Sequence, residues 1–315
     1  RTVPGRSHLM TVPKSQAPGQ LADSISGMPF MIAAVLLVPI SDAMSKSLTG
    51  IMGPFEIAFW RFVFQMLMLG LTIVALRRRL APGPWPLLLM GGTTIAVVLS
   101  SLIAAFVTMP IATAIAIFFV EPLILTLLSA WLLGEKTGWR RYAAVAVGLI
   151  GALIVIRPSW DVFGWASLLP LVAATGFALN AIVIRKLSRE MDGLSMQFWF
   201  SLVGMAIIGV GLLAFGRFDL VSLQGIDTGG PWGQLVFMGM FSGFTFFLFS
   251  EAFRRTSAST LAPFQYLEII GATIIGYVVF GDFPDFWTWV GTAIILASGL
   301  YVFQRERRQG RQAPQ

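Results

Sequence analysis

Two apolar stretches that follow one another decide the fold: PWPLLLMGGTTIAVVLSSLIAA at residues 84–105 and MPIATAIAIFFVEPLILTLLSAWLL at residues 109–133. Each is about as long as the roughly 20 residues that an α-helix needs to cross a bilayer core of about 30 Å. Together they contain one ionisable side chain, Glu121. A very short connection marked by Pro110 separates them, so they predict two membrane-spanning helices joined by a tight turn.

Eight more apolar runs lie on either side of this pair, between charged or Gly/Pro-rich segments. The predicted spans cover residues 28–48, 55–76, 84–105, 109–133, 138–156, 164–187, 194–214, 232–254, 258–280 and 286–304. The first run is too long for a cleaved signal peptide and lacks a small-residue cleavage site. The sequence therefore predicts an all-α, polytopic membrane protein with ten transmembrane helices.

The composition supports a lipid environment. Hydrophobic residues make up 56% of the chain and charged residues 12%, whereas a soluble domain carries about 25% charged residues. The net charge of +7 would suit nucleic acid, but the basic residues form short clusters between apolar runs, which argues against that partner. Cysteine is absent, and the single histidine, His8, lies in Arg1–Leu9, a stretch that we expect to be an expression scar before a start at Met10. We therefore predict no metal site and no cofactor.

Basic residues separate by side of the membrane. With a cytoplasmic N-terminus, fifteen lie on the cytoplasmic side: Arg77, Arg78, Arg79, Lys136, Arg140, Arg141, Arg185, Lys186, Arg189, Arg254, Arg255, Arg305, Arg307, Arg308 and Arg311. Three lie on the opposite side: Lys46, Arg157 and Arg217. The positive-inside rule then predicts that both termini are cytoplasmic. We expect a multi-pass protein of the bacterial inner membrane.

The chain contains an internal repeat. A shift of 147 residues carries Gly83-Pro84-Trp85 onto Gly230-Pro231-Trp232, Glu121 onto Glu268, and Gly134-Glu135 onto Gly281-Asp282. A shift of 139 residues carries Lys46-Ser47-Leu48 onto Arg185-Lys186-Leu187, and Phe59-Trp60 onto Phe198-Trp199. Each half has five spans, so the second half enters the membrane from the opposite side, as in many transporters. The predicted parts are a tail at 1–27, repeats at 28–156 and 164–304, and a basic tail at 305–315.

One motif in the first half resembles a known family. Val120-Glu121-Pro122 followed by Leu133-Gly134-Glu135 is similar to the drug/metabolite transporter (DMT) superfamily, specifically its EamA-type pair of domains, over about residues 28–304. The short loops and aromatic-rich helices resemble bacterial amino-acid exporters of the YddG type. This resemblance implies a secondary transporter that exports aromatic or neutral amino acids by alternating access. Ile269 and Asp282 depart from the motif in the second half, which weakens any expectation that both halves do the same job.

Ionisable residues inside a membrane usually face a cavity or a partner. The candidates are Asp42, Lys46, Arg61, Glu121, Glu251 and Glu268, whereas the fifth and tenth spans are small and apolar, typical of outer packing elements. Asp42 and Lys46, four residues apart, either form a local ion pair or contact substrate. Glu121 and Glu268 either bind an amine or carry protons, or else both are neutral or hydrogen-bonded to a neighbouring helix.

Arg61 breaks the symmetry, because its counterpart in the repeat is Phe200. Its charge needs compensation from Glu56, from an acidic side chain on a neighbouring helix, or from a ligand carboxylate. We predict that Arg61 holds the substrate carboxylate or gates the outer exit. The predicted polar lining also includes Gln65, Asn180, Gln197, Ser242, Thr245 and Gln265, with apolar walls from Trp60, Trp199, Phe244, Phe264 and Tyr266. Such a site suits a small zwitterion with an apolar side chain.

Other functions fit less well. The same fold could carry a drug, a sugar derivative or another metabolite, but a sugar phosphate would usually recruit more cations than Arg61 alone. An intramembrane enzyme is disfavoured because the sequence lacks nucleophile and metal-site motifs. Two inverted halves favour alternating access over a channel. The sequence implies no ATP-binding subunit; the expected partners are a small-molecule substrate and the lipid bilayer.

Overall fold

A computed structural model describes residues 27–132, 139–188, 190–216, 231–256 and 258–312. The described secondary structure consists of helices: α2 (Met28–Leu48), α3 (Pro54–Ala75), α4 (Trp85–Phe106), α5 (Ile111–Phe118), α6 (Glu121–Leu132), α7 (Trp139–Phe163), the short 3-10 helix η1 (Gly164–Leu168), α8 (Leu169–Leu187), α9 (Gly193–Ala214), α10 (Trp232–Arg255), α11 (Ala258–Gln265), α12 (Leu267–Phe280) and α13 (Phe286–Gln312). The expected expression scar, the Gly134-Glu135 motif and Arg217 lie outside the described residues.

The described helices account for the predicted spans. Eight helical segments are long and apolar enough to cross a membrane, and shorter apolar helices at Tyr142–Ile156 and Phe286–Val302 supply two further crossings. α5 and α6 together form one of the long segments. This part of the chain is therefore the all-α, polytopic membrane protein that the sequence predicts.

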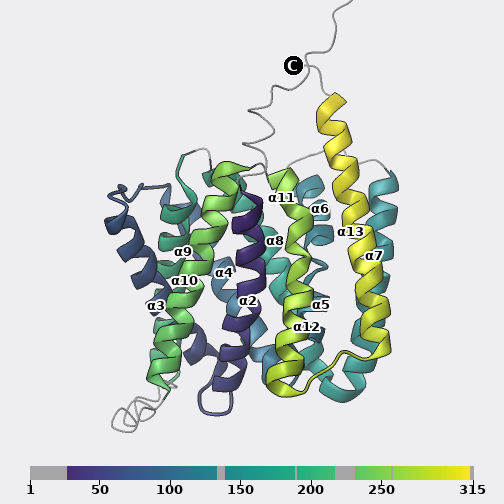
Figure 1. The fold of residues 1–315 in the computed structure, drawn as a ribbon, viewed down its shortest axis with the longest axis horizontal. Helices are drawn as coiled ribbons and strands as arrows, with labels where there is room; N and C mark the ends of the chain where they lie inside the picture. The colour runs from purple at the N-terminus through teal and green to yellow at the C-terminus, as the bar shows by residue number, and fades with distance from the viewer. Residues whose placement is uncertain (1–26, 133–138, 189, 217–230, 257, 313–315) are drawn as a thin grey trace, which may run out of the picture.

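Both described ends of the chain lie on the same side of the bundle, where α2 begins and α13 ends (Figure 1). We call this side the basic end, because α3, α8 and α10 also terminate here beside arginine or lysine residues. Glu251 near this end of α10 pairs with Arg78 at 3.1 Å, Arg254 at 2.7 Å and Arg255 at 3.2 Å. Glu251 thus anchors the basic end instead of lining the interior, and the cytoplasmic location of this end stays a prediction.

The packing pattern is preserved when each helix of the first half is exchanged for its counterpart in the second. α2 packs against α10 and α12, as α8 packs against α4 and α6; likewise α3 packs against α10, as α9 packs against α4. Counterparts also meet each other, in the pairs α3–α9 and α7–α13, and α5 of the fourth span meets α12 of the ninth. Each half makes five crossings, so α8 starts at the end opposite to that of α2 (Figure 1). The predicted five-plus-five inverted repeat is confirmed.

The fourth and ninth spans are interrupted at equivalent positions, which the sequence reading of 109–133 and 258–280 as single helices missed. α5 ends before Phe119 and α6 begins at Glu121, while Tyr266 separates α11 from α12. The rings of Phe119 and Tyr266 meet with centroids 5.5 Å apart. Pro122 has no N–H to donate to the carbonyl four residues earlier, which weakens the helix at this point. The interruptions therefore face each other across the interface between the halves.

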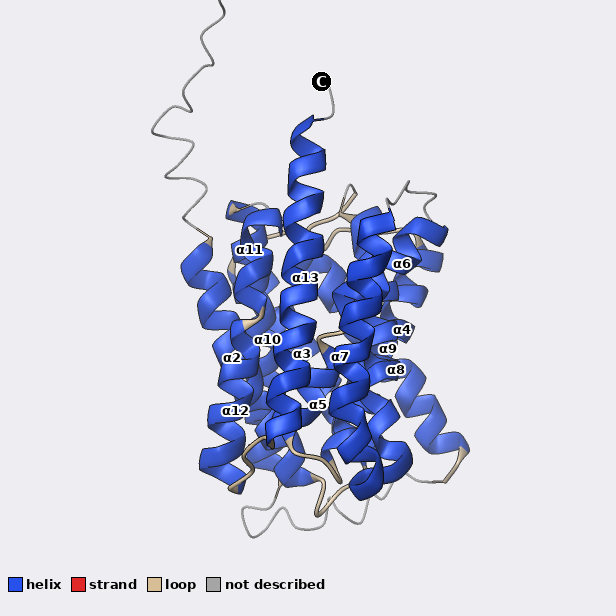
Figure 2. Ribbon diagram, turned by 90° about the vertical axis from the view of Figure 1, so that its right-hand side faces the viewer, coloured by secondary structure: helices blue, strands red, loops and turns tan. Residues whose placement is uncertain are grey.

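α7 and α13 form a pair at one side of the bundle, as the two views agree (Figures 1 and 2). Both helices are longer than predicted: α7 continues past residue 156 to Phe163, and α13 continues past residue 304 to Gln312. The apolar face of α7, including Ile150 and Leu153, is exposed as expected for an outer element.

Candidate functional site

A buried ion pair joins the first two spans. Arg61 of α3 donates from Nη1 to Asp42 Oδ1 of α2 at 3.1 Å and to Ser45 Oγ at 3.2 Å. The side chains of Arg61 and Asp42 are 9% and 7% exposed. Of the three partners that the sequence left open for Arg61, an acidic side chain on a neighbouring helix is the one observed. The local Asp42–Lys46 pair is not formed, because Asp42 turns toward Arg61.

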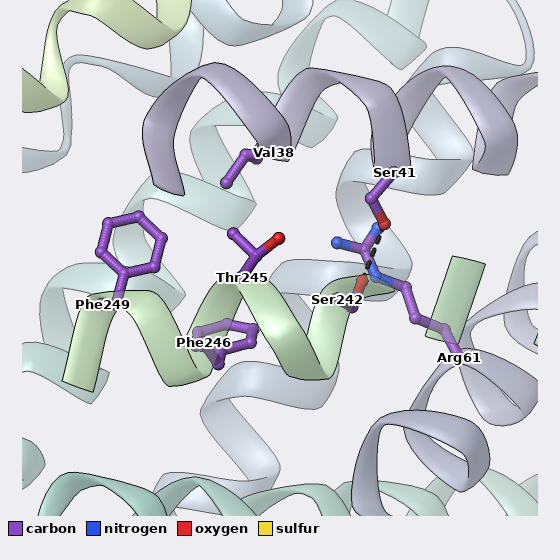
Figure 3. A pocket seen from close by; sticks show the side chains of 7 residues that line it. All are labelled: Val38, Ser41, Arg61, Ser242, Thr245, Phe246 and Phe249. Atoms are coloured by element: carbon purple, nitrogen blue, oxygen red, sulfur yellow. Dashed lines mark hydrogen bonds between the residues drawn. The ribbon is translucent and has the colours of Figure 1, made fainter. Parts of the chain in front are cut away.

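A small cavity of about 60 Å³ opens beside this ion pair, between α2 and α10 (Figure 3). Its polar part contains the Arg61 guanidinium and a hydrogen bond of 2.7 Å between the hydroxyls of Ser41 and Ser242. The remaining lining residues are Val38, Thr245, Phe246 and Phe249. The cavity thus has a charged, hydroxyl-rich end and an apolar, aromatic end. It has room for a few water-sized groups, so a whole metabolite requires the helices to move apart.

Arg61 has hydrogen-bonding capacity left over. Its Nε is buried and has no hydrogen-bond partner among the described residues. A buried N–H without a partner costs free energy, and a guanidinium can offer a planar pair of donors to a carboxylate. The side chain can therefore keep its contact with Asp42 and still donate a hydrogen bond to a ligand carboxylate.

Glu268 brings the second half of the chain to this site. It lies in the first turn of α12, directly after the interruption at Tyr266, and interacts electrostatically with both Asp42 and Arg61. Arg61 of α3 thus pairs with Asp42 of α2, and Glu268 of α12 is close enough to interact electrostatically with both. Glu121, its counterpart in the repeat, begins α6 and interacts electrostatically with Tyr266. The two glutamates therefore have different surroundings.

Three predicted polar residues lie away from the ion pair. Gln65 donates to Ser201 Oγ at 2.9 Å, which links α3 to α9. Asn180 donates to the Gly91 carbonyl and to Thr94 Oγ1, both at 2.9 Å, which links α8 to α4. The buried Nε2 of Gln197 has no partner among the described residues. The bonds of Gln65 and Asn180 hold helices together, as is usual for polar side chains between transmembrane helices.

The predicted aromatic walls mostly serve as packing. Trp60 meets Trp232 with ring centroids 4.8 Å apart, and Trp199 donates from Nε1 to the Ala81 carbonyl at 3.0 Å. Phe244 is 39% exposed on the outside of α10. Phe264 packs against the small cluster around Met31, Val35, Ala252 and Leu261, and Gln265 ends α11. Tyr266 lies at the helix interruption, between Phe119 and the region of Glu121.

Lys46 lies at the end of the bundle opposite to the basic end, and we call this side the far end. Its Nζ is 2.6 Å from Asp282 Oδ2, donates to the Met109 carbonyl at 3.2 Å, and lies 4.7 Å from the centre of the Phe280 ring. Lys46 belongs to the first half and Asp282 to the second. The pair therefore links the two halves at the far end.

Sequence reasoning missed five residues of the site: Val38, Ser41, Ser45, Phe246 and Phe249. Ser45 carried a usable signal, since it lies three residues after Asp42 and so shares its face, and Ser41 lies one turn before Ser45. Phe246 and Phe249 carried none, because α10 has phenylalanines on several faces and the sequence does not show which face meets α2.

Two inverted halves, interrupted helices at their interface, and a buried charged site between them are typical of a membrane transporter. The sequence profile of the EamA-like transporter family matches the chain twice, at residues 25–157 and 164–304. The chain belongs to the EamA-like transporter family, within the drug/metabolite transporter superfamily, and is a transporter rather than an enzyme.

Relatives with known roles span nearly the whole chain. An S-adenosylmethionine uptake transporter of Rickettsia prowazekii is 26% identical over 90% of this chain and 94% of its own length. A riboflavin transporter of Rhizobium johnstonii is 28% identical over 81% and 82% of the two chains. The pseudopaline exporter CntI of Pseudomonas aeruginosa is 25% identical over 87% and 94%. A solved crystal structure shares the fold, with a TM-score of 0.64, 19% identity, and coverage of 91% of this chain and 99% of the other.

Proposed function

We propose that this protein carries a small metabolite with an α-amino acid head group across the membrane by alternating access. In this proposal Arg61 binds the carboxylate of the head group, and Asp42 and Glu268 bind its ammonium. The observation that carries the proposal is the buried Arg61–Asp42 pair, in which the guanidinium keeps an unpaired N–H, with the Glu268 carboxyl group within electrostatic range of both side chains.

A zwitterion complements this set of charges. Its carboxylate supplies the acceptor that Arg61 Nε lacks. Its ammonium can pair with a carboxyl group of the site. Each charge of the ligand then has an opposite charge beside it, which lowers the cost of burying it. The apolar end of the cavity at Val38, Phe246 and Phe249 suits an apolar or aromatic substituent.

The candidate substrates differ in this head group. Aromatic and neutral amino acids, which the sequence resemblance favours as exported substrates, carry it. S-adenosylmethionine, which the Rickettsia relative takes up, also carries it, together with a sulfonium charge that the extra carboxyl group would favour. Riboflavin, which the Rhizobium relative carries, has neither a carboxylate nor an ammonium.

The other proposed lining residues play a supporting part. Ser242 and Thr245 offer hydroxyls within the cavity, while Gln265, Phe264, Tyr266 and Glu121 surround the two helix interruptions. Interrupted helices supply hinge points and free backbone groups at the interface of inverted halves. We propose that Lys46 with Asp282 keeps the far end shut until the substrate is bound from the other side.

Flux measurements in proteoliposomes test the proposal. The purified protein is reconstituted and the uptake and efflux of labelled phenylalanine, leucine, S-adenosylmethionine and riboflavin are followed. We expect saturable flux of at least one compound with an amino acid head group, and the preferred direction then decides between export and uptake. Phenethylamine and 3-phenylpropionate, which each lack one charge of phenylalanine, should compete poorly with a transported aromatic amino acid. Saturable flux of riboflavin alone would refute the head-group proposal.

A further inference from the structure

A second hollow lies on the outside of the bundle, away from the transport site. It is an open groove of about 480 Å³ between α7 and α13. Trp139 and Arg140 at the start of α7 and Tyr301 on α13 lie at one end of it, and Ala143 and Ala297 form part of its floor. The groove is therefore at the basic end, and its volume is within the range of about 300–1,000 Å³ that is usual for ligand sites.

The packing of the two helices explains why the groove forms there. Farther along, the helices touch closely: a Cβ added to Gly291 would lie 2.6 Å from the Gly151 carbonyl oxygen, and one added to Gly151 would lie 2.9 Å from Ile294 Cγ2. Toward the basic end the close contact continues on the inner side, where a Cβ added to Gly148 would meet Ser298 Oγ. On the outer side the small side chains of Ala143, Ala144 and Ala297 leave space, so a groove open to the outside remains between the helices.

The groove faces the lipid. Trp139 is 74% exposed and Tyr301 45% exposed, and along the same face of α7 the side chains of Val147 and Ile150 are 51% and 55% exposed. Exposed apolar side chains on a membrane-spanning helix contact acyl chains, and Trp and Tyr prefer the level of the lipid head groups. The groove thus runs from the head-group region, at Trp139 and Tyr301, into the hydrocarbon region, at Val147.

The charge of the groove indicates which class of lipid head group fits it. Its lining residues include one cation, Arg140, and no carboxylate. The Arg140 guanidinium lies 5.7 Å from the centre of the Trp139 ring, which holds it at the head-group level. Basic sites between transmembrane helices on the cytoplasmic side, where we predict the basic end to lie, suit anionic lipid head groups.

We propose that this groove binds an anionic phospholipid of the leaflet at the basic end. The phosphate lies against Arg140 and one acyl chain lies along the floor of Ala143 and Ala297. This site is independent of the transported metabolite and of the site at Arg61.

Native mass spectrometry of the intact protein tests the proposal. Detergent-purified, delipidated protein is mixed with equal amounts of phosphatidylglycerol and phosphatidylcholine that have the same acyl chains, and the retained lipid is counted. The wild type should retain several-fold more phosphatidylglycerol. Arg140→Gln should reduce that ratio to near one. Ala143→Leu, which fills the groove and keeps the charge, should reduce retention of both lipids.

Two matched controls separate this site from general effects. Lys186→Gln removes an exposed basic residue at the same end on α8, and Ala146→Leu enlarges an exposed residue of α7 that does not line the groove; both should retain lipid as the wild type does. Every variant must elute as a single species with an unchanged helical circular dichroism spectrum. The proposal is wrong if Arg140→Gln keeps the wild-type preference, if Ala143→Leu keeps full retention, or if the controls lose as much as the test variants.

Discussion

Arg61 is the residue on which the proposed function depends most. The sequence places this arginine without a counterpart in the repeat, and the structure pairs it with Asp42 in a site that water hardly reaches. A buried ion pair contributes little net stability, yet removing one partner leaves a buried charge uncompensated. The equivalent position in the second half is the uncharged Phe200, so the repeat itself does not require the charge of Arg61. Arg61 lies beside the cavity, where its charge can bind a ligand.

The first prediction concerns the stability of this pair. Arg61→Ala and Asp42→Ala should each destabilise the protein by about 3–5 kcal/mol, because each leaves one charge buried alone. The double variant should be destabilised less than the sum of the two single variants, because both charges are gone. Unfolding in detergent, followed by circular dichroism, measures the three values. Additive effects would show that the two side chains do not interact.

A second prediction at this scale uses glycine contacts. Gly291→Ala should destabilise the protein by about 1–3 kcal/mol, because the new methyl group would meet the Gly151 backbone. Gly211→Ala, on α9 with no atom within 4 Å of the added methyl group, serves as the control and should have little effect or stabilise slightly. Melting temperatures of the purified variants compare them. Equal effects at the two positions would contradict the close packing of α7 on α13.

At the scale of elements, the sequence predicted more about the helices than about their interruptions. Span positions follow from hydropathy, so they agree to within a residue or two with α2, α3, α4, α9 and α10, and with η1 and α8 taken together. The interruptions at Phe119 and Tyr266 were missed because hydropathy does not report local hydrogen bonding, although Pro122 and Pro263 mark weak points in both helices. The partner of Lys46 was missed and that of Arg61 was left open among three candidates, because contacts between helices do not follow from spacing along one helix.

The Lys46–Asp282 pair yields a prediction for the far end. Lys46→Asp and Asp282→Lys should each change transport strongly, since like charges would repel across the two halves. The charge-reversed double variant should recover a substantial part of wild-type flux, because the attraction is restored. Initial rates of counterflow in proteoliposomes, normalised to inserted protein, measure this. A double variant no better than either single variant would show that the pair has no role in closing the far end.

The whole molecule consists of two halves with the same arrangement of helices, which cross the membrane in opposite directions. The repeat in sequence and the packing of α2 on α10 and α8 on α4 express the same symmetry. The candidate site at Arg61 departs from this symmetry, since Phe200 and Ala181 stand at the positions equivalent to Arg61 and Asp42. A near-symmetric scaffold can alternate between its two ends, while asymmetric side chains hold an asymmetric ligand.

Orientation in the membrane is predicted at this scale. The chain has no cysteine, so single cysteines introduced at Gly50, in the loop after α2, and at Ser188, after α8, report their side without background. In intact cells a membrane-impermeant thiol reagent should label the Gly50→Cys variant and leave the Ser188→Cys variant unlabelled until the membrane is opened. Labelling of both from outside would contradict the ten-span topology, and the reverse pattern would contradict cytoplasmic termini.

The concentration dependence of transport in Arg61→Lys tests the central claim most directly, that Arg61 binds the substrate carboxylate. Lysine keeps the positive charge beside Asp42 but loses the planar pair of donors. With the substrate identified in proteoliposomes, this variant should insert and fold as the wild type does. Its kcat/KM should fall by roughly 10- to 150-fold, equivalent to one charged hydrogen bond of about 1.5–3 kcal/mol. A folded Arg61→Lys protein with wild-type kcat/KM would show that the carboxylate is bound elsewhere.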